Sequence, residues 1–80
     1  MNDQDILQRI QHLVTEEHEL TQLREEGKLE GDQHERMREL EVNLDQCWDL
    51  LRQRRARRHA GLNPDDAQVR SEDIVEHYQQ

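Results

Sequence analysis

The chain contains five histidines, the side chains most able to bind a metal ion. They are His12, His18, His34, His59 and His77. Helical di-metal proteins place a glutamate three residues before each such histidine, on an inward face. The residues at those positions are Arg9, Thr15, Gly31, Ala56 and Ile74, so the motif is absent. We therefore expect solvated surface histidines, with no metal and no other cofactor.

Nucleophilic catalysis has one candidate, the single cysteine Cys47. It adjoins Trp48 in an apolar stretch, which is typical of a buried and unreactive thiol. A lone cysteine also excludes a disulfide within the chain. Gly27 and Gly31 bracket a turn, but the sequence there lacks the adjacent lysine-serine pair of a phosphate-binding loop. The sequence thus predicts no enzyme and no small-molecule substrate.

Five arginines within residues 52–58 form the arginine block, the strongest candidate for binding a partner. They are Arg52, Arg54, Arg55, Arg57 and Arg58. Guanidinium groups match carboxylate and phosphate, so a partner could be an acidic protein or a nucleic acid. Cations at a helix C-terminus also stabilise the negative end of the helix dipole. The same arginines could pair with Asp3, Asp5, Asp65 or Asp66. We rank pairing within the assembly first, an acidic protein second and nucleic acid third, because no aromatic side chain interleaves with the arginines.

The elements that position these groups are two amphipathic helices. Asn2 or Asp3 can cap a first helix over residues 3–26, and Gly27 is a typical stop. Asp32 and Glu35 resemble a capping box that opens a second helix over residues 33–60. Apolar side chains recur every three or four residues and predict the core or dimer interface. They are Ile6, Ile10, Leu13, Val14, Leu20, Met37, Leu40, Leu44, Cys47, Trp48 and Leu51.

The short break between the helices predicts an all-α, antiparallel two-helix hairpin over residues 1–62. Folding it back places Leu20 near Leu40, Leu13 near Leu44, and Ile6 near Leu51. A chain of 80 residues forms a marginal core, and each apolar stripe is wider than one hairpin covers. We therefore expect a homodimer that forms a four-helix bundle.

Residues 63–80 follow as a polar, acidic tail. The turn signal at residues 63–66 precedes only four sizeable apolar side chains. These are Val69, Ile74, Val75 and Tyr78. We expect this tail to be loosely ordered, and the helical core to fold without it.

The net charge of −8 argues against general coating of nucleic acid. No stretch resembles a secretory leader or a transmembrane run, so we expect a cytoplasmic protein without membrane contact. A non-enzymatic protein-interaction module is the leading interpretation. A nucleic-acid or ribosome-associated factor that uses the arginine block is the alternative.

Three segments resemble a known family. They are residues 40–58, with the specific core Leu-Asp-Gln-Cys-Trp-Asp-Leu-Leu at residues 44–51, and residues 2–7 and 63–70. Together they resemble a family of short actinobacterial proteins catalogued as a domain of unknown function. The resemblance covers nearly the whole chain and implies a bacterial cytosolic protein. It implies no activity, cofactor or site for this chain.

Overall fold

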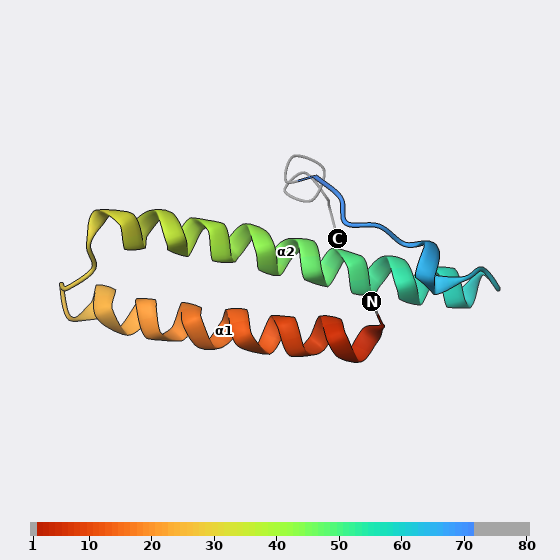
Figure 1. Ribbon diagram of the computed structural model, residues 1–80, viewed down its shortest axis with the longest axis horizontal. Helices are drawn as coiled ribbons and strands as arrows, with labels where there is room; N and C mark the ends of the chain where they lie inside the picture. The colour runs from red at the N-terminus through yellow and green to blue at the C-terminus, as the bar shows by residue number, and fades with distance from the viewer. Residues whose placement is uncertain (1, 72–80) are drawn as a thin grey trace.

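Two long helices run antiparallel along most of the molecule, as the computed structural model of residues 2–71 shows (Figure 1). Helix α1 spans Asp3–Glu25 and helix α2 spans Gly31–His59. A single 3-10 turn, η1 (Pro64–Asp66), follows α2, and residues 67–71 then run back alongside α2 (Figure 1). The predicted all-α hairpin is confirmed, with helix ends within two residues of the expected positions.

Polar side chains fix where each helix begins. The Oδ1 of Asn2 accepts the Asp5 backbone N–H at 2.9 Å, and the Asp5 carboxylate accepts the Asn2 N–H at 3.2 Å, so the predicted cap at Asn2 is confirmed. The prediction that Asp32 caps the second helix is wrong. Gly31 is already helical, and the Gln33 side chain instead accepts the Glu30 N–H at 2.9 Å, so α2 begins two residues earlier.

Both helices end at a glycine with the same backbone conformation and the same hydrogen bonds. Gly27 and Gly61 have φ angles of 71° and 74°, a left-handed conformation that favours glycine. The N–H of Gly27 donates to Arg24 O, and that of Lys28 donates to Leu23 O, at 3.0 and 2.8 Å. Gly61 and Leu62 repeat this pair of hydrogen bonds at the end of α2. These Schellman motifs satisfy terminal carbonyls and turn the chain within a few residues.

One apolar row from each helix forms the core. Its buried residues are Ile6, Ile10, Leu13, Leu20, Leu40, Leu44, Cys47 and Leu50. Leu23, Leu29, Met37, Leu51 and Ala67 pack against them while partly exposed. The predicted apolar rows therefore meet along the hairpin. Val14 and Trp48 do not join the core of this chain, because the helix twist turns both side chains out of the seam and leaves each 45% exposed.

The tail is docked over the part that the structure describes. Gln53 donates to the carbonyl of Gln68 at 2.7 Å, and Gln46 donates to that of Arg70 at 3.2 Å. Side chains of α2 therefore hold the backbone of residues 68–70 against the helix, and the expectation of a loosely ordered tail as a whole stays a prediction. Ile74, Val75 and Tyr78 lie outside the described residues.

Candidate functional site

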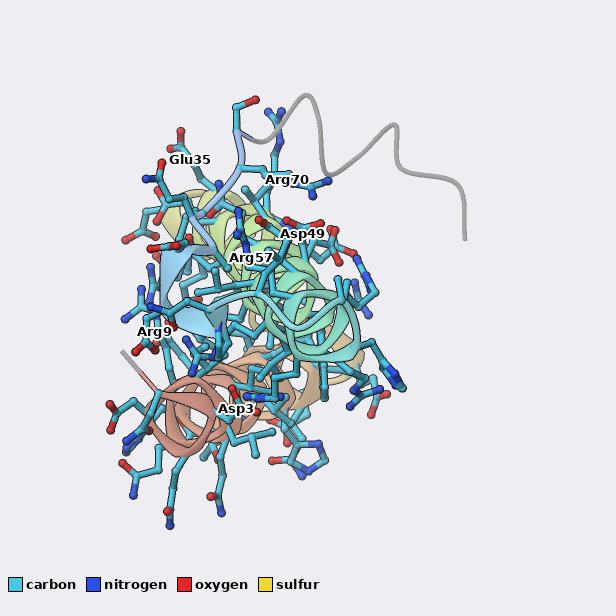
Figure 2. All side chains as sticks on the ribbon, turned by 90° about the vertical axis from the view of Figure 1, so that its right-hand side faces the viewer. Asp3, Arg9, Glu35, Asp49, Arg57 and Arg70 are labelled. Carbon is cyan, nitrogen blue, oxygen red and sulfur yellow. The ribbon has the colours of Figure 1, made fainter. Side chains whose placement is uncertain are left out.

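Asp3 and Arg54 join three segments at the end of the hairpin that lies opposite the interhelical turn. Figure 2 shows Asp3 between α1 and α2. Arg54 is 5% exposed, and its Nε donates to Asp3 Oδ1 at 2.5 Å. Its Nη1 donates to Pro64 O at 3.1 Å and to Asp65 Oδ1 at 3.0 Å. One guanidinium thus connects the first turn of α1, the last third of α2 and η1.

Arg58 adds a second cation to this group. It contacts the other carboxylate oxygen of Asp3. Hydrogen bonds from Arg58, and to a smaller extent from Arg54, hold the pKa of Asp3 below its ordinary value. We call Asp3, Arg54, Arg58 and Asp65 the Asp3 cluster.

The Asp3 cluster agrees with the first-ranked interpretation of the arginine block, which is pairing within the assembly. Arg54, also a candidate partner contact, is buried, and its Nε and Nη1 donate within the chain. Asp5, proposed as another internal partner, instead caps its own helix. Among the predicted contact residues, Arg55 is exposed, Arg57 is partly exposed, and neither pairs with an acid among residues 2–71.

Asp49 is a buried acid that the sequence pattern did not reveal. Its side chain is almost fully enclosed, accepts from Gln53 Nε2 at 2.9 Å, and lies 3.5 Å from Arg70 Nε. Figure 2 shows Asp49 and Arg70 near each other beside α2. The carboxylate therefore holds the returning segment against the helix.

Cys47 borders a cavity of about 130 Å³ under the returning segment. The other lining residues are Ile6, Arg9, Asn43, Gln46, Leu50 and Val69. Burial raises the pKa of the Cys47 thiol, so the neutral, weakly nucleophilic form predominates at neutral pH. Residues 2–71 contain no group of three His, Cys, Asp or Glu side chains placed to hold a metal ion.

Glu16 and Arg36 form a second link between the helices, on the side that carries Arg9. Arg9 and Glu16 are seven residues apart on α1 and thus share one face. Arg36 donates to both Glu16 oxygens, at 2.5 and 3.0 Å, and to Glu39 at 3.1 Å. This bidentate contact lowers the pKa of Glu16.

The opposite side of the hairpin exposes large apolar side chains. Leu7 is 49% exposed, and Val14, seven residues later, lies on the same face of α1. On α2, Trp48 is flanked at heptad spacing by Glu41 and Arg55. The returning segment lies on the side of Arg9 (Figure 2).

A groove between the helices shows that the two rows share a face. This groove of about 420 Å³ is lined by Thr21 from α1 and by Met37 and Glu41 from α2. Thr21 continues the row of Leu7 and Val14, and Glu41 belongs to the row of Trp48. We call the surface made by Leu7, Val14, Thr21, Glu41, Trp48 and Arg55 the open face. The assignment of Val14 and Trp48 to a dimer interface stays a prediction.

No helix within residues 2–71 combines the length and apolar character needed to cross a membrane.

No solved structure matches the sequence of this chain. An uncharacterized protein of Mycobacterium bovis is 49% identical over 77 residues, which cover 95% of this chain and 88% of the relative. Uncharacterized proteins from two strains of Mycobacterium tuberculosis match with the same identity and coverage. Residues 2–80 match the model of a family described as a protein of unknown function (DUF2630). The chain therefore belongs to this family.

Proposed function

We propose that this chain is a non-enzymatic protein-interaction module that acts as a homodimer. The observation that carries the proposal is the open face, where Leu7, Val14 and Trp48 stay exposed while the returning segment covers the other side. Exposed apolar side chains gathered on one face mark interaction surfaces. Two hairpins joined by these faces form a four-helix bundle.

The open face is large enough for such an interface. The 23 residues of α1 give a length of about 35 Å, and two adjacent helices are about 20 Å wide. The projected area is therefore about 700 Å², close to the roughly 800 Å² that each partner buries in a stable complex. Tryptophan is also the residue type most enriched among the energetically dominant contacts of interfaces.

The arginine block gives weaker support to the alternative, a nucleic-acid or ribosome-associated factor. Arg54 is buried and Arg58 pairs with Asp3, so two of the five cations are already engaged within the chain. An acidic protein partner could still contact Arg55 and Arg57. Binding to RNA or DNA that weakens steeply with salt would favour the alternative.

Sedimentation and intrinsic fluorescence test the homodimer. Trp48 is the only tryptophan and is half exposed in the single chain, so its emission should shift to shorter wavelength as protein concentration rises. Sedimentation equilibrium should show the dimer over the same concentration range. A monomer with unchanged emission at all accessible concentrations would overturn the homodimer.

Two valines provide a matched comparison. Val14→Lys places a charge on the open face and should produce a folded monomer. Val69→Lys makes the same change at a valine that is 61% exposed on the opposite side, and it should leave the dimer intact. Equal effects of the two substitutions on sedimentation would assign the interface elsewhere.

A further inference from the structure

The open face has a self-complementary pattern that specifies how a second copy would dock. This inference rests on the proposed homodimer and adds its orientation. Along α2, an acid, a tryptophan and a base follow one another at intervals of seven residues: Glu41, Trp48 and Arg55. A two-fold axis through Trp48 and perpendicular to the helix would place each Glu41 opposite Arg55 of the second copy.

Helix α1 has the same centre of symmetry. Asp3 contacts Arg54 and Arg58 at one end, and Glu16 contacts Arg36 farther along, so Trp48 lies level with the stretch between Leu7 and Val14. The midpoint of Leu7 and Val14 therefore lies near the level of Trp48. The same axis would place Leu7 against Val14 of the second copy, and Trp48 against its own equivalent.

Charge also differs between the two ends of the hairpin. Residues 16–41, the half nearest the turn, carry ten acids and four bases, for a net charge of −6. Residues 2–15 and 42–62, the other half, carry four acids and six bases, for a net charge of +2. If two copies docked with their turns at the same end, two strongly acidic halves would face each other within about one Debye length.

We propose that two copies dock through their open faces with their turns at opposite ends, so that Glu41 pairs with Arg55 of the other copy on each side of a central Trp48 pair. Each arginine end then lies over an acidic half. Arg55 is the arginine that we assign to this pairing, because it is exposed and makes no ion pair among residues 2–71.

Charge reversal tests the pairing. Glu41→Arg and Arg55→Glu should each raise the Kd of the dimer about ten- to thirtyfold, because each change replaces two attractions with two repulsions. The double variant should regain an affinity within about threefold of wild type. Glu35→Arg and Arg57→Glu are matched controls on other faces of α2 and should change the Kd by less than about threefold. Single variants as tight as wild type, or a double variant that stays weak, would overturn the pairing.

A distance measurement tests the orientation separately. A spin label at Glu25→Cys, in a Cys47→Ala background with unchanged circular dichroism, lies about 22 Å from the proposed axis at 1.5 Å per residue. The label-to-label distance should be about 45 Å in the proposed dimer, twice the distance to the axis. A distance below about 25 Å would show turns at the same end and overturn the orientation while leaving the homodimer standing. A dimer insensitive to Val14→Lys would instead remove the open face as the interface, and a monomer would remove both proposals.

Discussion

Two neighbouring side chains of α1 provide a direct test of which face is buried. Ile6 is fully enclosed, whereas Leu7 is half exposed on the open face. Truncating an enclosed isoleucine to alanine removes its burial and leaves a cavity, at a cost of about 3 kcal/mol. Leu7 buries only about half of its surface in a single hairpin, so Leu7→Ala should cost about 1 kcal/mol there.

These costs translate into melting temperatures. A domain of this size loses about 4–8 °C for each kcal/mol, so Ile6→Ala should lower Tm by roughly 12–24 °C and Leu7→Ala by roughly 4–8 °C. Thermal unfolding followed by circular dichroism at low protein concentration measures both. An equal fall for the two variants in the dilute protein would refute the assignment of the buried face.

Protein concentration adds a second comparison. If the open face joins two copies, Tm rises with concentration, because only the folded chain associates. Leu7→Ala then costs more in the concentrated protein than in the dilute protein, while the cost of Ile6→Ala changes little. A constant difference between the variants across concentration would argue against Leu7 as an interface residue.

Three further outcomes follow from charges and burial. The carboxyl pKa values of Asp3 and Glu16 are held below their ordinary 3.8 and 4.5, so the stability from their ion pairs is full above those values and declines as pH falls through them. Urea unfolding across this range should show the decline, and Asp3→Asn with Glu16→Gln should flatten it. Cys47 should react with iodoacetamide at least about tenfold more slowly in the native protein than in urea, and equal rates would contradict its burial. Arg70→Met should destabilise the protein by about 1–3 kcal/mol in urea unfolding, because Asp49 stays buried with a partner lost, whereas Arg57→Met should have little effect.

The helices and their pairing could be predicted because local signals and long-range packing agree. Asn2 and Gly27 mark the ends of α1, and the spacing of Ile6, Ile10 and Leu13 matches one face of a helix. The start of α2 was less well determined, since two polar pairs compete for the cap. Asp32 with Glu35 has the more typical composition, but the Gln33 side chain reaches back to Glu30 once Gly31 adopts a helical conformation.

The candidate site was only partly predictable. Asp3 and Asp65 were expected near the arginine block, because the hairpin brings opposite charges together. The burial of Asp49 was not expected, since an acid on a charged helix face is ordinarily solvated. It is enclosed by a segment that docks through hydrogen bonds from Gln46 and Gln53 to backbone carbonyls, and sequence composition does not indicate such contacts.

The position of the Asp3 cluster has a consequence for folding kinetics. Arg54 and Asp3 are 51 residues apart, so their contact closes almost the whole hairpin, whereas the turn at Gly27 requires only local contacts. The entropy of closing a loop grows with its length, so helix pairing should start near the turn and reach Asp3 last. Removing the Arg54 side chain should therefore accelerate unfolding while leaving the folding rate nearly unchanged. The cluster is thus expected to slow the separation of the helices at the end opposite the turn.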